Sequence, residues 1–443
     1  MKTVGIIAEY NPFHNGHAYQ IAEAKRITGA DYAVVVMSGN FVQRGTPAIW
    51  DKYTRTRAAL LGGADLVFEL PVIYATASAE YFAEGGVALL TALGVDCICF
   101  GSECGDVDAL MEIATIFANE SPEFKDALNF SLREGKNYPV AREEALKAHC
   151  AAHNIPIREE LLDTPNNLLG IEYCKAILTQ NSPLIPYSIK RIGDSYHEKT
   201  ASEGRYCSAT ALRSLLPGLT TAFSDSEQQL HNSSVDSMQF ASETCSKLYD
   251  QFRVQVPSDV LPIYQEAFRT LPLMTANDFS ELLSYRLLYT DADTLSTYAD
   301  WNIELANRVL SQSASVSGFE QTAALLKSKQ LTLTRANRML LHVLLHITSA
   351  QLQTAREQGA CFYARLLGLR QSSSHALRHL SDCSSVPVIN KLAPAVKELN
   401  GIARELLQQD IHAAQLYDMV QQRKGIPTPV NEYTRGVILS HAF

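Results

Sequence analysis

Two histidines, His14 and His17, stand three residues apart near the N-terminus and are the side chains of this chain best suited to chemistry. They follow the hydrophobic run Val4–Ala8 and precede a pattern that predicts an amphipathic helix from about Ala18. A strand, tight turn and helix in this order place both imidazoles beside a helix N-terminus, where backbone N–H groups bind phosphate oxygens. Hydrogen bonds from the imidazoles would there stabilise charge that builds between the α- and β-phosphates of ATP. The alternative is a chance H-x-G-H pattern in a loop.

Gly16 lies between the two histidines and supports this interpretation. Without a Cβ, a glycine lets a nucleotide approach the backbone closely. We therefore predict a nucleotide site at the end of the first strand.

The first half of the chain alternates apolar strands with helices. Such a pattern predicts an α/β fold with a Rossmann-like parallel sheet covered on both faces. Ligands of these sheets bind at the carboxyl ends of the strands. Three polar segments directly follow predicted strands, so we expect them to meet at one edge: His14–His17, Ser38–Asn40 and Gly101–Glu103.

After about Ser242 the pattern becomes helical, and a Ser-, Thr-, Gln- and Asn-rich stretch comes before it. With 443 residues, more than one domain is expected. We predict a catalytic domain over residues 1–217, a linker or loop over 218–240, and a mostly α-helical C-terminal domain over 241–443.

Further polar residues near predicted strand ends and helix starts are candidate phosphate contacts: Lys52, Lys190, Ser208, Thr210 and Arg213. Cations there would stabilise a transferring phosphoryl group, and a Ser/Thr-rich helix start binds anions. Each has a plain structural alternative, namely a solvated helix face, a charged strand end or ordinary helix capping. The pair Asn166-Asn167 either caps a helix or contacts the nucleotide, and the sequence does not separate these roles.

The charge of the chain is unevenly distributed. The net charge is −9, yet residues 325–443 hold 14 Lys and Arg against 7 Asp and Glu. A basic region on an acidic protein indicates an RNA partner or a solvated helical surface. We expect five arginines in predicted helices to line one RNA-binding face: Arg335, Arg338, Arg365, Arg370 and Arg378.

Nine cysteines without a CxxC pair indicate structural thiols in a reducing compartment rather than a zinc site, so no metal site is expected among the protein side chains. No run of 18 apolar residues is present, and the N-terminus lacks a signal-peptide pattern. A cytoplasmic protein without membrane contact is expected.

Seven segments occur in the order typical of one bacterial family: GIIAEYNPFHNGHAYQI, MSGNFVQRGTPAIWDKYTRTRAAL, GADLVFELPV, FGSE, PNNLLGIEY, SIKRIGDSYHE and SATALR. Together they make the chain resemble the tRNA(Met) cytidine acetate ligases, which share the H-x-G-H pattern of nucleotidylyltransferases. The resemblance extends through LLHVLLHIT, FYARLLGL and DIHAAQLYDM and so covers nearly the whole chain.

The resemblance implies that ATP and acetate give acetyl-adenylate and pyrophosphate. The N4 amine of the wobble cytidine, position 34 of elongator tRNA(Met), then takes the acetyl group to give N4-acetylcytidine, without acetyl-CoA. His14 and His17 would be the catalytic residues that supply hydrogen-bond donors for adenylation, and magnesium is expected with ATP, as in other ATP reactions. The implied ATP-binding residues are Ile7, Ala8, Glu9, Tyr10, Asn11, Pro12, Phe13, His14, Asn15, Gly16, His17, Ala18, Tyr19, Gln20, Gly101, Asn166 or Asn167, and Arg191.

Two other functions remain open at this stage. A small-molecule nucleotidylyltransferase, of the pantetheine-phosphate or nicotinamide-mononucleotide type, would share the histidine pattern but rarely needs a helical region of this length. An RNA-binding protein with an inactive nucleotide site is disfavoured by the intact histidine pattern.

Overall fold

A computed structural model describes residues 1–156, 158, 161–191, 207–229, 243–312, 318–426 and 431–440 of the chain. Its centre is an eight-stranded sheet with the order β10-β8-β5-β2-β1-β6-β7, in which β9 pairs with β8, and β3 and β4 form a separate hairpin. The strands are β1 Thr3–Ala8, β2 Tyr32–Ser38, β3 Phe41–Val42, β4 Thr46–Pro47, β5 Leu66–Leu70, β6 Cys97–Ser102, β7 Ile185–Lys190, β8 Ala364–Arg370, β9 Val388–Ile389 and β10 Ile438–Ser440.

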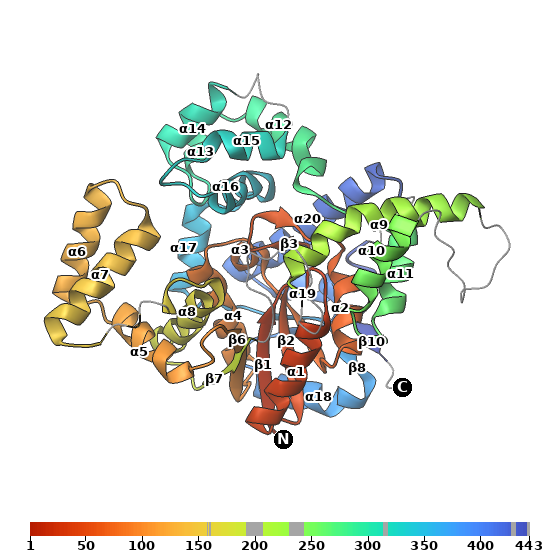
Figure 1. Cartoon of the computed structure of the whole chain (residues 1–443), viewed down its shortest axis with the longest axis horizontal. Helices are drawn as coiled ribbons and strands as arrows, with labels where there is room; N and C mark the ends of the chain where they lie inside the picture. Colours follow the sequence, from red (N-terminus) through yellow and green to blue (C-terminus); the bar gives the residue numbers. More distant parts are fainter. Residues whose placement is uncertain are drawn as a thin grey trace.

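Helices surround this sheet, as Figure 1 shows. Those before residue 275 are α1 Asn15–Thr28, α2 Lys52–Leu61, α3 Val72–Ala75, α4 Ala79–Ala92, α5 Val107–Ala118, α6 Pro122–Arg133, α7 Tyr138–His153, α8 Pro165–Thr179, α9 Ala209–Gln229, α10 Glu243–Arg253 and α11 Leu261–Thr270. The later ones are η2 Ala276–Phe279, α12 Ser280–Leu288, α13 Ala292–Ser296, α14 Ile303–Leu310, α15 Phe319–Leu326, α16 Leu333–Leu345, α17 Ser349–Glu357, η4 Gln371–Ser373, α18 Ser374–Cys383, α19 Leu392–Glu398 and α20 Gly401–Arg423.

Alternate side chains of the strands enter two separate hydrophobic cores, because successive residues of a strand point to opposite faces. Along β2, Val34 and Val36 belong to the core that contains α4, α5 and α8. Val35 and Met37 belong to the other core, which contains α1, α2 and α9–α11. The central strands are therefore buried on both faces, as their continuous apolar sequences predict.

The expected α/β fold class is confirmed, with one change in strand direction. The strands β1, β2, β5, β6 and β7 are parallel, whereas β8 pairs with β5 in the antiparallel sense. No helix in the part of the chain that the structure describes is long and apolar enough to span a membrane.

We expected residues 1–217 to contain the sheet and residues 241–443 to form a separate helical domain. This boundary is wrong for the sheet, which continues into the C-terminal part of the chain. Strands β8, β9 and β10 come from residues 364–440 and join the sheet beside β5. The short apolar run of β8 satisfies helical and strand patterns equally, so periodicity did not distinguish them. Within the expected linker 218–240, residues 218–229 continue helix α9, and residues 230–240 lie outside the described residues.

Helices η2 to α16, residues 276–345, form a lobe that stands over the carboxyl edge of the sheet (Figure 1). Phe279 of this lobe contacts Phe41, which lies just after β2, with ring centroids 5.5 Å apart. His342 contacts the carbonyl oxygens of Ala299 in the lobe and of Thr76 after α3, at 3.0 and 2.9 Å. These contacts fix the lobe to the strand-end loops.

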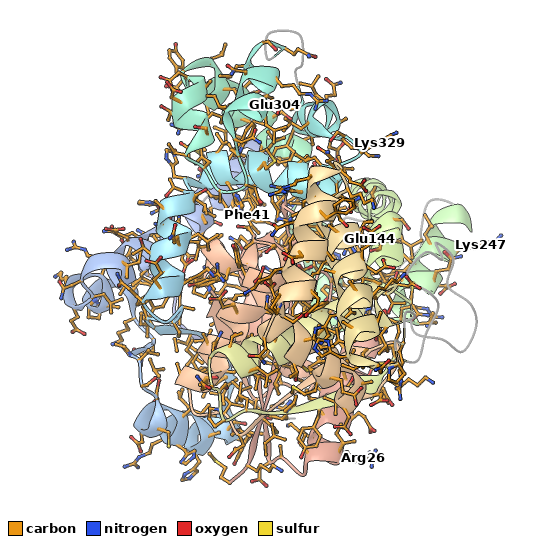
Figure 2. The ribbon with its side chains drawn as sticks, turned by 90° about the vertical axis from the view of Figure 1, so that its left-hand side faces the viewer. Arg26, Phe41, Glu144, Lys247, Glu304 and Lys329 are labelled. Atoms are coloured by element: carbon orange, nitrogen blue, oxygen red, sulfur yellow. The ribbon has the colours of Figure 1, made fainter. Side chains whose placement is uncertain are left out.

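The hairpin of α6 and α7 lies next to the lobe, at the left of the molecule in Figure 1. Figure 2 shows Glu144 on this hairpin, with Glu304 and Lys329 on the lobe. The tip of the hairpin reaches the lobe, since the Gln330 side chain donates a hydrogen bond to the Gly135 carbonyl oxygen at 2.8 Å.

Candidate active site

The turn between β1 and α1 holds the two histidines in one interlocked arrangement. His14 is the N-cap of α1, and its Nδ1 accepts a hydrogen bond from the Gly16 N–H at 3.1 Å. His17 Nδ1 accepts from the His14 N–H at 3.3 Å. The rings stack with centroids 3.7 Å apart. The spacing of three residues therefore gives a reciprocal capping box that fixes both rings.

These hydrogen bonds also determine where each imidazole carries its proton. A neutral imidazole has one donor nitrogen and one acceptor nitrogen, so an accepting Nδ1 places the proton on Nε2. Burial lowers the pKa of His14 to about 3, and the charges of Arg191 and Arg213 act in the same direction. Burial, followed by His14 and Arg191, also lowers the pKa of His17 well below its usual value. Both rings are neutral near pH 7, and each offers one Nε2–H donor.

Segments far away in the sequence hold the backbone of this turn. Arg213 on α9 donates to the Asn11 carbonyl oxygen at 2.8 Å, and the Tyr264 hydroxyl on α11 donates to the Phe13 carbonyl oxygen at 3.0 Å. Asn15 bonds through its backbone N–H to the Gln255 carbonyl oxygen at 2.8 Å. Helices α9–α11 are thus the support that preorganises the histidines, and the sequence pattern did not reveal this role.

The ends of β6 and β7 bring a second group of expected residues together. The Glu103 carboxylate accepts from the Asn166 side chain at 2.6 Å and from the Asn167 backbone N–H at 2.9 Å. Arg191 follows β7 and lies against β6, because a Cβ on Gly101 would come within 3.3 Å of its Cγ. Lys190, the last residue of β7, is exposed.

The two asparagines differ in their surroundings. Asn167 is buried, and its side-chain oxygen accepts from the Cys104 N–H at 3.1 Å. Asn166 is only half-buried. Of the two, Asn166 is therefore the residue whose side-chain amide is partly exposed.

The expected phosphate contacts at the start of α9 have local partners. Ser208 Oγ accepts from the Ala211 N–H at 3.2 Å, as a helix cap does. Thr210 Oγ accepts from Arg213 Nη2 at 2.9 Å. Arg213 lies near the histidines, since its charge lowers the pKa of His14. This helix start thus brings a cation to the histidine turn, while its hydroxyls hold the helix and the arginine.

Lys52 does not reach the site, contrary to our expectation. Its side chain is fully buried, and its Nζ lies 2.8 Å from Glu69 Oε1 and 3.1 Å from Glu432 Oε2. Arg365 pairs with the same two carboxylates. Two cations and two carboxylates form a charge cluster beneath the carboxyl edge, and we call these four residues the buried charge cluster.

Arg55, on the same helix as Lys52, lies nearer the site. Its guanidinium is fully buried and donates to the carbonyl oxygens of Glu9 at 2.6 Å and Ser38 at 3.0 Å. It also donates to the Gly39 carbonyl oxygen. Arg55 therefore ties together the ends of β1 and β2. Only its position within the polar segment after β2 pointed to this role.

The remaining residues of the expected ATP-binding stretch divide between core and surface. Tyr10, Asn11, Pro12 and Phe13 are buried. Half-buried residues continue along the end of β1 and the first turns of α1: Ile7, Ala8, Glu9, Asn15, Gly16, Ala18, Tyr19 and Gln20. The half-buried residues are those whose atoms remain partly accessible at the surface.

The expected arginine face does not exist as one surface. Arg365 is buried in the charge cluster, and Arg338 is buried in the lobe near Asp300. Because β8 runs antiparallel to β5, Arg370 lies at the amino edge of the sheet, next to Asp65. Arg378 is exposed on α18, which follows there. Arg335 is in the lobe at the opposite edge. Helical spacing alone did not reveal the strand direction that separates them.

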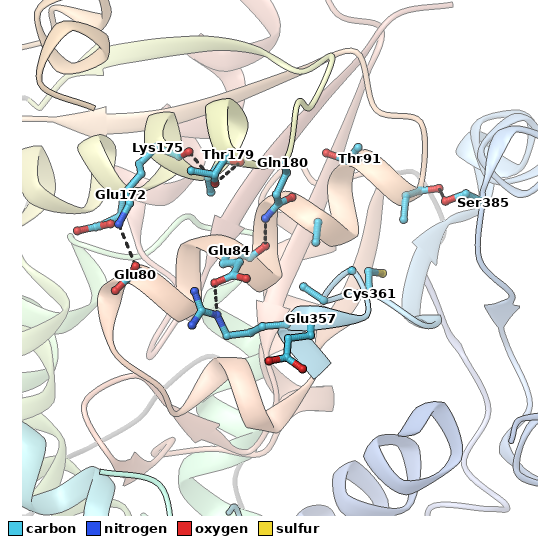
Figure 3. A pocket seen from close by; sticks show the side chains of 16 residues that line it. Glu80, Glu84, Thr91, Glu172, Lys175, Thr179, Gln180, Glu357, Cys361 and Ser385 are labelled. Atoms are coloured by element: carbon cyan, nitrogen blue, oxygen red, sulfur yellow. Dashed lines mark hydrogen bonds and ion pairs between the residues drawn. The ribbon is translucent and has the colours of Figure 1, made fainter. Parts of the chain in front are cut away.

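A cavity of about 530 Å³ lies between α4, α8 and the segment after α17 (Figure 3). Its lining includes two ion pairs, Lys175–Glu80 at 2.9 Å and Arg356–Glu84 at 2.7 Å. None of the residues that line it belongs to the histidine turn or to the strand-end groups described above. We therefore place the chemistry at the histidine turn and not in this cavity.

Comparison with known proteins gives a consistent result. The family model described as HIGH Nucleotidyl Transferase matches residues 1–428. A relative from Acetivibrio thermocellus, named tRNA(Met) cytidine acetate ligase, is 36% identical over 99% of this chain and 100% of its own length. A relative of the same name from Caldicellulosiruptor saccharolyticus is 38% identical over 94% of each chain.

Solved structures of Thermotoga maritima TmcAL cover 100% of both chains. The form bound with alpha-thio ATP has a TM-score of 0.84 at 25% identity, and an apo form has a TM-score of 0.87 at 26% identity. The chain therefore belongs to the HIGH nucleotidyl transferases and, among them, to the tRNA(Met) cytidine acetate ligase family.

Proposed function

We propose that this protein acetylates the wobble cytidine, position 34, of elongator tRNA(Met) to N4-acetylcytidine. ATP and acetate react to acetyl-adenylate and pyrophosphate, and transfer of the acetyl group then releases AMP. The observation that carries the proposal is the pair of neutral histidines, each with an Nε2–H donor at the end of β1. The names of the relatives supply the substrates.

The geometry of the turn suits the first step. An acetate oxygen attacks the α-phosphorus and the bond to pyrophosphate breaks. Two fixed Nε2–H donors stabilise the charge that grows on the phosphate oxygens, and no reorganisation is needed because both Nδ1 atoms are already held. Arg191 and Arg213, whose charges act on His14, would stabilise the leaving pyrophosphate. Acetate needs no base, because it is already ionised near pH 7.

Magnesium would accompany ATP. Within the described ranges no group of three or more His, Cys, Asp or Glu side chains could hold a metal ion. When bound, the ion would neutralise charge on the phosphates.

The lobe is our candidate for the tRNA contact. It stands over the carboxyl edge, and Lys327 and Lys329 are exposed on it. We expect Lys327→Ala with Lys329→Ala to weaken tRNA binding and to lower its salt slope by about 1 for each phosphate that the variant no longer neutralises. Filter binding at two salt concentrations measures both. Unchanged affinity and slope would place the RNA surface elsewhere.

One experiment tests the activity directly. ATP–pyrophosphate exchange is measured with and without acetate, and tRNA incubated with ATP and labelled acetate is analysed by nucleoside mass spectrometry. We expect acetate-dependent exchange and label in N4-acetylcytidine. Exchange that requires a phosphorylated small molecule instead of acetate would favour an ordinary nucleotidylyltransferase.

A further inference from the structure

Transfer of an acetyl group to an amine releases a proton, and the two histidines are not arranged to accept it. Their Nδ1 atoms accept backbone hydrogen bonds, and their Nε2 atoms carry the remaining proton. Burial keeps the pKa of His14 at about 3, so the ring is a poor base. Another group must therefore take the proton in the second step of the proposed function.

Glu9 is the carboxylate of the strand-end turn that retains a free oxygen. It directly follows β1, and its side chain is half-buried. Its Oε1 accepts from the Gln43 N–H at 2.9 Å. Among the described residues, none donates a hydrogen bond to its Oε2, and no Lys, Arg or His pairs with it.

The position of this carboxylate is fixed from several sides. The Glu9 carbonyl oxygen accepts from Arg55, which prevents the backbone from turning. Burial lowers the pKa of Arg213 on α9, and the charge of Glu9 partly opposes this effect. Burial raises the pKa of Tyr173 on α8, and the charge of Glu9 raises it further. The carboxylate therefore lies within electrostatic range of helices from both faces of the sheet.

The other carboxylates near the strand ends are occupied. Glu69 belongs to the buried charge cluster, where it pairs with Lys52 and Arg365. Both oxygens of Glu103 accept hydrogen bonds from the start of α8. Glu9 is thus the one carboxylate among these three that can take up a proton without breaking an ion pair or a hydrogen bond.

We propose that Glu9 is the general base of acetyl transfer, an inference that rests on the proposed function. The amine nitrogen forms a bond to the acetyl carbon, and the bond from that carbon to the adenylate oxygen breaks. AMP leaves with the electron pair, and the proton of the amine passes to Glu9 Oε2. The first step involves no such proton, so Glu9 acts on the two steps unequally.

This inequality gives the test. In Glu9→Gln the amide oxygen still accepts from Gln43, but the side chain no longer accepts the proton. Enzyme-bound acetyl-adenylate is formed first, and single-turnover transfer to tRNA(Met) is then timed by rapid quench. We expect transfer to fall by about 10²–10⁴-fold, the usual contribution of a general base. Acetate-dependent pyrophosphate exchange should fall by clearly less than transfer does, because no proton moves in that step.

Two further variants sharpen the result. Glu9→Asp, which keeps a carboxylate, should recover part of the transfer rate. Glu103→Gln is the matched control at the neighbouring strand end, and it should raise the KM for ATP without a selective loss of transfer.

Two results would overturn the assignment: transfer within about tenfold of the unmodified protein, or an equal loss of exchange and transfer. The second result would indicate a role in ATP or magnesium binding. Acetate-dependent exchange by the unmodified protein tests the proposed function separately, so the two failures are distinguishable.

Discussion

Replacing Glu432 with glutamine should lower the free energy of unfolding by about 3 kcal/mol at pH 7. Glu432 lies in the buried charge cluster, where its Oε2 is 3.1 Å from Lys52 Nζ, and its side chain is 1% exposed. Burial raises its pKa, but Lys52 and Arg365 outweigh this effect and lower the pKa from 4.5 to about 2. Each pKa unit corresponds to about 1.4 kcal/mol, which gives the estimate.

The sign of the pH dependence follows from the lowered pKa. The stabilisation is fully present above the unfolded pKa of about 4.3 and is lost as the pH falls towards 2. Urea unfolding at several pH values should therefore show a gap between the two proteins that is largest near neutrality and closes in acid. Glu281→Gln is the control, because its ion pair with Arg423 is exposed and should contribute less than about 1 kcal/mol. A loss below about 1 kcal/mol for Glu432→Gln at pH 7 would refute the reasoning.

Three other predictions concern the site and its supports. His14→Asn keeps an acceptor near the Nδ1 position but lacks the Nε2 donor, so acetate-dependent exchange should fall by about 10²–10³-fold with little change in melting temperature; normal exchange would contradict this. Because the pKa of His14 is about 3, protonation of this ring should not reduce the exchange rate between about pH 8 and 6. A fall in the exchange rate near the ordinary histidine pKa of about 6.5, absent in His14→Asn, would disprove this prediction. Burial raises the pKa of Asp410 to about 7, so the folded state holds a proton that the unfolded state releases, and stability should fall from about pH 4 to 7. Asp410→Asn should flatten this slope in urea titrations, and an unchanged slope would argue against it.

Much of the N-terminal fold was predictable because its signals are local. The sequence predicts a helix over Lys52–Leu61 and a short strand over Ile185–Lys190, and both elements have these ends in the structure. Both are bounded by strong signals, such as the glycine pair that follows Leu61. The turn that carries His14 and His17 was predictable for the same reason.

What failed depends on contacts between distant residues. The sequence places Lys52 at the phosphates, but its partner Glu432 comes from the end of the chain, and no local pattern indicates such a pair. The neutral state of the histidines likewise follows from burial, and the charge of the distant Arg191 acts in the same direction. The apolar spacing of Ala395–Leu407 predicts one helix. The segment is divided between α19 and α20 at Leu399 and Asn400, and Gly401 has a φ of +53°.

The late strand β8 has a consequence for synthesis of the protein on the ribosome. Until residues 364–370 have been made, β5 stands at the edge of the nascent sheet, with every one of its five residues apolar or destined for burial. An uncovered apolar edge strand pairs readily with other chains. Release of a truncated chain that ends before β8 would therefore yield an aggregation-prone product, although it contains both histidines. Completion of the sheet, and with it protection from misassembly, waits for the last quarter of translation.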